Sequence, residues 1–254
     1  MKSLANQVVL ISGGLGRLGS AFATAVQDAG GRVCIFDLAD KSDRESLSDV
    51  SRQRSVFVQG DVTNAKDIDR AIQVCKEKFG SLDAAVHSAY PTSESWGRAF
   101  EELSFDDLSA NLSMQLGGSI LFSQRVIRSF EQDGGGNLIH VSSIQGIAPP
   151  KFWHYEGTTM TSPIEYAAVK SGVIAITRYL AKYYSHRNIR VNCISPGGIL
   201  DDQPAEFLKR YRSSCVSKGM LDASDVSGVI LFLLSEDARY ISGQNIVVDD
   251  GWSL

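Results

Sequence analysis

The stretch "ISGGLGRLGS", Ile11 to Ser20, decides the fold. Its glycines Gly14, Gly16 and Gly19 have the spacing G-x-G-x-x-G, after the apolar run "VVLIS" (8–12) and before a helical pattern. Glycine lets the backbone turn tightly and approach a pyrophosphate closely, and the N-terminus of the following helix supplies free N–H donors. The stretch therefore predicts a strand–turn–helix unit that binds a dinucleotide.

An acidic residue follows at the distance that this turn requires. Asp37 ends the second apolar run, "RVCIF" (32–36), 18 residues beyond Gly19. A carboxylate at this point bonds the ribose hydroxyls of NAD and repels the additional phosphate of NADP, so NAD is favoured. Arg17 argues the other way, because a guanidinium beside the turn can pair with that phosphate. NADP is therefore not excluded.

Apolar runs rich in Val and Ile recur along the chain. They are "VVLIS" (8–12), "RVCIF" (32–36), "VFVQ" (56–59), "AAVHS" (84–88), "NLIHVS" (137–142), "VNCIS" (191–195) and "NIVV" (245–248). Helical patterns lie between them. This alternation predicts an α/β fold, a Rossmann-like doubly wound parallel sheet of about seven strands in a single domain, 1–254. The segment 144–162 is longer than an ordinary connection and is expected to be a substrate loop.

Composition and charge exclude several classes of protein. The 254 residues have a formal net charge of -4, from 25 basic and 29 acidic side chains, and no basic block suited to nucleic acid. No apolar run approaches a membrane span, and the N-terminal run is too short for a signal peptide. The cysteines form no CxxC pair: Cys34, Cys75, Cys193 and Cys215. A cytoplasmic chain that binds no nucleic acid, membrane or metal is expected.

A second motif carries chemistry. "YAAVK" places the phenol of Tyr166 and the ammonium of Lys170 at i and i+4, on one face of a helix. Upstream, "HVSSIQG" ends a predicted strand, and its Ser143 can hold a substrate oxygen. A tyrosine that gives or takes a proton during hydride transfer needs a neighbouring cation, because its ordinary pKa is near 10.

These motifs resemble the short-chain dehydrogenase/reductase family, short branch, over nearly the whole chain. Shared with that family are the glycine turn, "GDVT" with Asp61 and Val62, "SS" before "IQG", "YAAVK", "SPGG" with Pro196 and Gly197, and the tail "SGQNIVVDDGW". The resemblance implies an NAD(P)-dependent oxidoreductase that interconverts a carbonyl and a secondary alcohol of a small molecule. Tyr166 would be the acid/base, Lys170 would lower its pKa and bond the nicotinamide ribose, and Ser143 would position the substrate. The cofactor would be bound by Gly13, Gly14, Gly16, Arg17, Leu18, Gly19, Asp37, Asp61, Val62, Ser88, Ala89, Tyr166, Lys170, Pro196, Gly197 and Ile199.

The sequence departs from the family around the cofactor. The spacing of Gly13, Gly16 and Gly19 resembles the longer branch, so the turn is expected to differ in shape. In "HSAY", His87 and Tyr90 replace an asparagine and a glycine of the family's N-N-A-G.

Two further departures concern polar side chains. An alignment without gaps puts Gln115 where the family has a relay asparagine, with Asn111 one helical turn earlier, and either amide can serve. Asp201 falls where a threonine often bonds the cofactor phosphate.

The spacing from Ser143 to Tyr166 is about ten residues longer than usual in the family. The additional residues include Trp153, His154 and Tyr155, which are expected to contact the substrate and suit a polyhydroxylated ligand. An ordered loop packed by its own aromatic side chains is the alternative. Sequences with "YEGT" and "SP" before "YAAVK" are similar to family members of bacterial flagellin modification and surface-sugar synthesis, which favours a sugar or sugar-derived substrate.

Two other functions stay open. The length and the tail also fit a 3-oxoacyl thioester reductase, and the altered motifs leave room for a catalytically silent dinucleotide-binding regulator. A homotetramer or homodimer is expected in each case. The helix predicted over 162–184 is apolar on more than one face, and the tail ends in Trp252 and Leu254, so both elements are predicted to contact a second copy.

Overall fold

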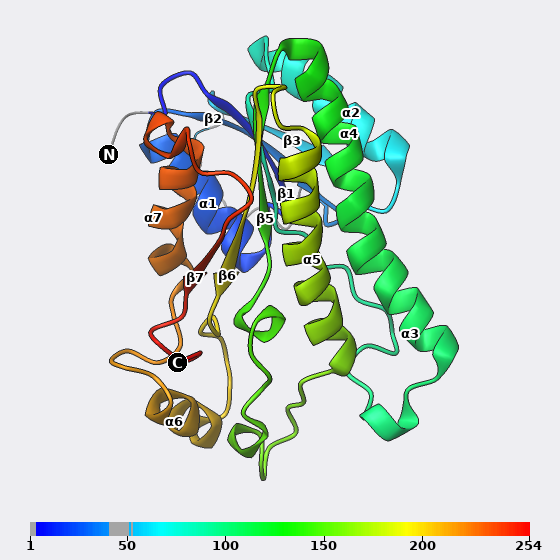
Figure 1. Ribbon diagram of the computed structural model, residues 1–254, viewed down its shortest axis with the longest axis vertical. Helices are drawn as coiled ribbons and strands as arrows, with labels where there is room; N and C mark the ends of the chain where they lie inside the picture. The colour runs from blue at the N-terminus through cyan, green and yellow to red at the C-terminus, as the bar shows by residue number, and fades with distance from the viewer. Residues whose placement is uncertain (1–3, 41–50, 52) are drawn as a thin grey trace.

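The centre of the structure is one parallel sheet (Figure 1). The computed structural model describes residues 4–40, 51 and 53–254, and within them the sheet has seven strands in the order β3-β2-β1-β4-β5-β6-β7. The strands are β1 (Val8–Ser12), β2 (Arg32–Asp37), β3 (Ser55–Gln59), β4 (Ala84–His87), β5 (Gly136–Val141), β6 (Ile189–Pro196) and β7 (Asn245–Val248). Neighbouring strands all pair in parallel. The predicted Rossmann-like, doubly wound fold is confirmed.

Helices cover both faces of this sheet. They are α1 (Arg17–Asp28), α2 (Ala65–Phe79), α3 (Phe105–Leu112), α4 (Gly118–Asp133), α5 (Ile164–Tyr183), α6 (Ala205–Ser213) and α7 (Ala223–Leu234). Helices α1 and α7 pack on one face, and α2, α4 and α5 on the other (Figure 1). Phe22 and Phe122 are fully buried on the two opposite faces. Burial of each such side chain stabilises the fold by about 1.5 to 3 kcal/mol.

Local sequence sets where the helices begin and end. The side chain of Asn64 accepts the N–H of Lys66 at the start of α2, and Gly80 ends that helix with a φ of 90°. Gly134 ends α4 in the same left-handed conformation, with a φ of 88°. Only glycine adopts this conformation at little cost, so each helix ends where the sequence has a glycine.

The strand order reverses beside β1, the central point of the fold. The chain runs from β1 to β2 and β3 in one direction and from β4 to β7 in the other. The crossovers diverge there, so a crevice opens beyond the carboxyl ends of β1 and β4, which is where ligands bind in open α/β sheets.

The segment 144–162 contains two short 3-10 turns, Ile144–Gly146 and Phe152–His154. Helix α5 begins at Ile164, after Pro163, because the residues around a proline favour extended backbone. It is slightly shorter than the helix predicted over 162–184. Among the described residues, no helix has both the length and the apolar character needed to cross a bilayer.

Candidate active site

The glycine turn is closed by contacts that leave no room for side chains. Gly13 has a φ of 65°, and a Cβ added to it would lie 2.6 Å from Cα of Ala89. A Cβ on Gly19 would lie 2.1 Å from the carbonyl oxygen of Gly13. A Cβ on Gly14 would meet Cγ2 of Ile35 at 2.8 Å, so this glycine allows the turn to pack on β2. The turn therefore brings bare backbone to the crevice, as close binding of a pyrophosphate requires.

A cleft of about 730 Å³ opens along this turn. Of the residues predicted to bind a cofactor, it is lined by Gly13, Gly16, Arg17, Leu18, Gly19, Asp37, Asp61, Val62, Ser88 and Ala89. The carboxylate of Asp37 is held in place, because Oδ2 accepts the N–H of Leu15 (2.9 Å) and Oδ1 accepts the N–H of Ala39 (3.1 Å). The end of β2 thus presents a fixed carboxylate at one end of the cleft.

Arg17 does not face this cleft as a free cation. Its guanidinium forms an ion pair with Asp201 and donates a hydrogen bond to the carbonyl of Leu200 (3.0 Å). Both charged side chains are about half exposed, at 48% and 46%. Asp201, which stands where the family often has threonine, therefore pairs with the charge of Arg17.

Two smaller cavities adjoin the cleft and meet at Tyr166. One, of about 300 Å³, is lined by Ser143, Tyr166, Pro196, Gly197 and Ile199 among the predicted residues. The other, of about 280 Å³, is lined by Tyr166, Lys170 and Ser88. Leu18 lines all three spaces. The structure thus brings the predicted serine, tyrosine and lysine to one place beside the cleft.

The electrostatics of this trio follow from burial. Burial raises the pKa of Tyr166, and a hydrogen bond with the side chain of Ser143 acts in the opposite direction. Lys170 is 8% exposed, and its Nζ donates to the carbonyl of Val141 (3.0 Å). Burial lowers the pKa of Lys170 to about 8. The ammonium lies 5.5 Å from the centre of the Tyr166 ring, close enough to favour a phenolate when the proton leaves.

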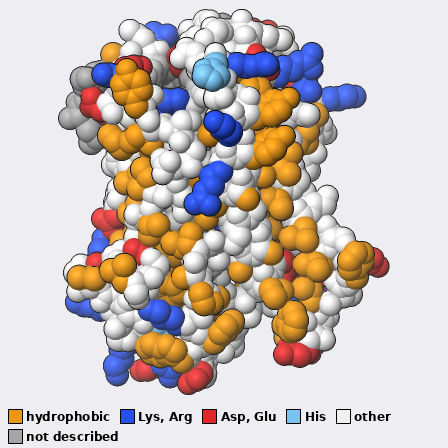
Figure 2. All heavy atoms as spheres, in the orientation of Figure 1, with side chains coloured by type: hydrophobic (Ala, Val, Ile, Leu, Met, Phe, Trp, Pro, Cys, Tyr) orange, Lys and Arg blue, Asp and Glu red, His pale blue; other side chains and the backbone are white. Residues whose placement is uncertain are grey.

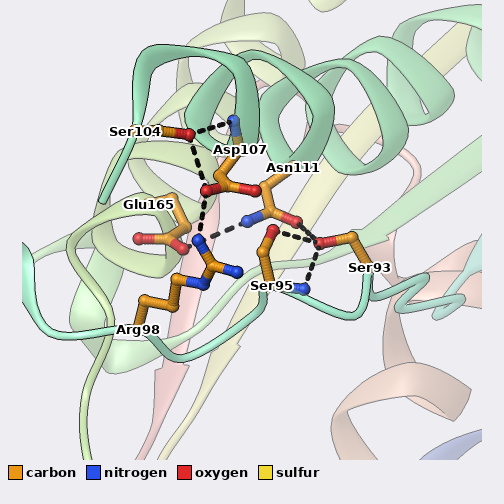
Figure 3. A network of polar contacts seen from close by, with 7 residues as sticks. All are labelled: Ser93, Ser95, Arg98, Ser104, Asp107, Asn111 and Glu165. Atoms are coloured by element: carbon orange, nitrogen blue, oxygen red, sulfur yellow. Dashed lines mark hydrogen bonds and ion pairs between the residues drawn. The ribbon is translucent and has the colours of Figure 1, made fainter. Parts of the chain in front are cut away.

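The structure separates the two candidate relay amides. Asn111 is fully engaged (Figure 3): its Oδ1 accepts from Ser93 Oγ (2.6 Å) and its Nδ2 donates to Glu165 Oε1 (3.2 Å). Gln115 lies in a π-helical turn, Ser113–Gly117, between α3 and α4. Its side chain is buried, and neither its oxygen nor its nitrogen has a hydrogen-bond partner. Gln115 thus differs from Asn111: its amide is not held by Ser93 or Glu165, and its near neighbour is the hydroxyl of Tyr90.

The predicted substrate residues divide. Tyr155 lines the 300 Å³ cavity, whereas Trp153 and His154 are not among its lining residues. His154 is 1% exposed and bonds Ser214 through Nε2 (2.9 Å), and burial lowers its pKa to about 4. Its ring packs among Phe207, Tyr211 and Trp252. The structure therefore places His154 among the aromatic side chains of the core and Trp153 at the surface, 44% exposed.

Other aromatic residues form the wall of that cavity. It is also lined by residues that no sequence motif indicated as substrate contacts: Gln145, Met160, Gln203, Phe207, Tyr211, Met220 and Trp252. The i, i+4 spacing of Phe207 and Tyr211 indicates an apolar face of a helix, but it does not indicate that this face lines a cavity beside Ser143. None of the described residues that line this cavity is Asp, Glu, Lys, Arg or His. The cavity suits an uncharged group.

The described residues hold no group of three His, Cys, Asp or Glu side chains placed to bind a metal ion.

Comparison with known proteins extends over the whole chain. A family model described as "Enoyl-(Acyl carrier protein) reductase" matches residues 16–253. Post-translational flagellin modification protein A of Campylobacter coli is 38% identical, over 99% of this chain and 100% of its own length. The 7alpha-hydroxysteroid dehydrogenase of Bacteroides fragilis is 30% identical, over 100% of this chain and 97% of its own. A crystal structure of a short chain dehydrogenase from Leptospira borgpetersenii with bound NAD+ superposes with a TM-score of 0.87, at 29% identity, over 99% of this chain and 94% of the other.

Proposed function

The chain belongs to the short-chain dehydrogenase/reductase family, and from this membership we propose that it uses NAD to interconvert a carbonyl and a secondary alcohol on a sugar or sugar-derived substrate. Members of this family share oxidoreductase chemistry with a nicotinamide cofactor. One observation carries the proposal to this site: Tyr166 lies where two small cavities join the cofactor cleft, with Ser143 and Lys170 beside it.

The residues present fit a dinucleotide. The closed glycine turn and the 730 Å³ cleft provide backbone donors and space, and Asp37 provides an acceptor for ribose hydroxyls. NAD is favoured over NADP because Asp37 is fixed at the cleft while Arg17 is paired with Asp201. When bound, the nicotinamide accepts or supplies the hydride.

The chain's own residues manage the proton. In alcohol oxidation, Ser143 Oγ holds the substrate oxygen and the Tyr166 phenolate takes the proton of the substrate hydroxyl. The carbon that bears this hydroxyl gives up its hydrogen as a hydride to the nicotinamide. The Lys170 ammonium stabilises the phenolate beforehand. Reduction reverses the sequence, and Tyr166 donates the proton to the carbonyl oxygen. We assign to Gln115 the role of the relay amide, since its side chain has no hydrogen-bond partner.

The substrate class rests on two observations. The relative at 38% identity is a flagellin modification protein. The cavity beside Ser143 combines hydroxyl and amide groups with aromatic walls, and the described lining residues carry no charged side chain. A ring that bears hydroxyl groups fits such walls, because its faces stack on aromatic rings and its hydroxyls form hydrogen bonds. The reacting part of the substrate is therefore proposed to be uncharged.

A spectrophotometric screen tests this function. Formation or loss of reduced nicotinamide is followed with neutral sugars and cyclic polyols, with their carboxylate counterparts, and with 3-oxoacyl thioesters. Turnover of neutral sugar-type substrates with NAD is expected. Faster turnover of acyl thioesters would favour the reductase suggested by the family model's description, and the absence of turnover in every arm would contradict the proposal.

We propose further that the protein is a homotetramer or homodimer. Tyr179 and Tyr183 on α5 are 65% and 61% exposed and stack with ring centres 5.8 Å apart. Figure 2 shows hydrophobic side chains exposed over the surface where α4 and α5 lie. In the tail, Trp252 is buried within its own chain and is not free to contact a second copy. Leu254 is 99% exposed and is the tail residue proposed to make that contact.

A further inference from the structure

Tyr90 lies between the cofactor cleft and the catalytic trio. It follows β4, in the "HSAY" segment where the resembling family has glycine. Its side chain lines both the 730 Å³ cleft and the 280 Å³ cavity that contains Tyr166 and Lys170. A large ring therefore stands where the resembling sequences have no side chain, and the proposed mechanism gives it no role.

The ring of Tyr90 packs edge to face against two others. Its centre is 5.6 Å from that of Tyr166 and 5.4 Å from that of Trp96, each at an interplanar angle of 89°. Trp96 in turn is 6.3 Å from Tyr166, at 80°. Edge-to-face pairs at such distances are attractive, so Tyr90 and Trp96 restrict the orientation of the Tyr166 ring.

Tyr90 also contacts the lysine. The ammonium of Lys170 lies 5.3 Å from the centre of the Tyr90 ring and 5.5 Å from that of Tyr166. Its hydrogen bond to the carbonyl of Val141 anchors one side of the ammonium. A buried cation between two aromatic rings is stabilised by their π faces, which partly replace the water that burial removed.

We propose that Tyr90 is a positioning residue of this active site: its ring and that of Tyr166 form an aromatic cage that holds the Lys170 ammonium beside the catalytic phenol. This inference rests on the proposed function, because it takes Tyr166 and Lys170 as the acid/base pair. The ring, rather than the hydroxyl, performs the role.

The state of the Tyr90 hydroxyl agrees with that role. Tyr90 is 43% exposed as a residue, and its hydroxyl interacts with the side chain of Gln115. Burial and the neighbouring Tyr166 raise the pKa of Tyr90 far above its usual range. A raised pKa favours the neutral phenol of Tyr90, which fits a role for its ring rather than for its proton.

The titratable groups that face Lys170 are few and come from four elements. They are Tyr166 on its own helix, His87 on β4 with Tyr90 after it, His140 on β5 and Cys193 on β6. Burial lowers the pKa of both histidines and raises that of Cys193 to about 12, so all three stay neutral near neutral pH. Beside the carbonyl of Val141, the rings of Tyr90 and Tyr166 are therefore the groups that lie against the ammonium.

The test measures the lysine directly. NMR of protein with ¹³C-labelled lysine side chains, assigned with Lys170→Met, follows the pKa of Lys170 without substrate or cofactor. In Tyr90→Leu, which keeps an apolar side chain but removes the π face, this pKa is expected to fall by about 0.5 to 1.5 units. Tyr90→Phe keeps the ring and should leave it unchanged. Tyr240→Leu, a matched change at a tyrosine that is 89% exposed, is the control.

Kinetics give a second readout. Because the ammonium of Tyr90→Leu is less stable, the Tyr166 phenolate loses support, and the acid limb of kcat/KM for alcohol oxidation should move to higher pH. Tyr90→Met should act in the same direction if Tyr90→Leu does not fold. An unchanged pKa of Lys170 would overturn the cage, and a raised pKa would mean that Tyr90 only excludes water. Since the NMR titration needs no turnover, a failed substrate screen and a failed cage are distinguishable.

Discussion

Arg17 and Asp201 form an ion pair that joins the start of α1 to the loop after β6. The pair neutralises the guanidinium nearest the glycine turn, while Asp37 remains at the cleft with its carboxylate held by the N–H groups of Leu15 and Ala39. Of the charged side chains described along the cleft, the one fixed at the end of β2 is therefore a carboxylate, which repels an additional phosphate.

This arrangement predicts that the wild-type protein binds NAD more tightly than NADP. Replacing Asp37 with Ala removes the like charge that faces the 2′-phosphate and should reduce the preference by about tenfold or reverse it. Titration of both cofactors by intrinsic fluorescence measures it. Asp202→Ala, which removes an exposed carboxylate, is the control for net charge. Tighter binding of NADP by the wild type would contradict the prediction.

Tyr166→Phe should abolish turnover and leave cofactor binding nearly intact. The change removes one hydroxyl at the reaction centre and nothing from the dinucleotide cleft, so we expect a loss of at least about 100-fold in kcat. Tyr155→Phe, in the same cavity, should cost much less. Retained activity in Tyr166→Phe would move the acid/base role to another group, with Tyr155 the first to examine.

The two candidate amides should respond in opposite ways. Asn111→Ala removes the hydrogen bonds that its amide forms with Ser93 and Glu165, so the free energy of unfolding should fall by about 1 to 3 kcal/mol. Gln115→Ala removes an amide without a partner, so stability should change little while kcat falls. Thermal unfolding and kcat of both variants decide the matter, and the reverse pattern would assign the relay to Asn111.

Acid should destabilise the protein through its buried histidines. Burial lowers the pKa of His140 to about 4, and both ring nitrogens are bonded, to Ser123 and Thr177. A histidine whose pKa is lowered by folding supports the fold fully above about pH 6.5, and this support is lost as the pH falls toward 4. The share of His140 is about 2 kcal/mol at pH 5.

Urea unfolding at about pH 7 and pH 5 measures this loss. In His140→Asn, the loss of unfolding free energy between these two pH values should be smaller by about 2 kcal/mol, the contribution of His140. His186→Asn, at an exposed position with a φ of 73° that asparagine tolerates, is the matched control and should unfold with the pH dependence of the wild type.

Assembly should depend on the exposed face of α5. Light scattering at low micromolar concentration is expected to give a multiple of the 27.6 kDa chain mass. Tyr179→Glu with Tyr183→Glu places charges on that face and should shift the mass toward the monomer. A monomeric wild type with full activity would refute the proposal.

The sequence by itself indicated the alternation of strands and helices, and the edge of the sheet at which the proposed site residues lie. Gly19 is required by a close backbone contact within its own turn, and Tyr166 and Lys170 share a face because helical spacing is local. Ser143 joins them because parallel strands all end at one edge. These relationships depend on short segments or on the general geometry of parallel sheets, so they are legible in one chain.

Only the tertiary structure decided which aromatic side chains line the cavities and which lie in the core. His154 is in the core because α6 and the C-terminal tail, far away in sequence, bring Tyr211 and Trp252 around its ring. Tyr90 follows β4 and Lys170 lies on α5, and no sequence pattern relates these two segments, yet the ammonium lies over the Tyr90 ring. Burial and partner choice depend on the sum of contacts from distant segments, and an aromatic residue in a loop looks the same in sequence whether it stacks on a substrate or on its own core.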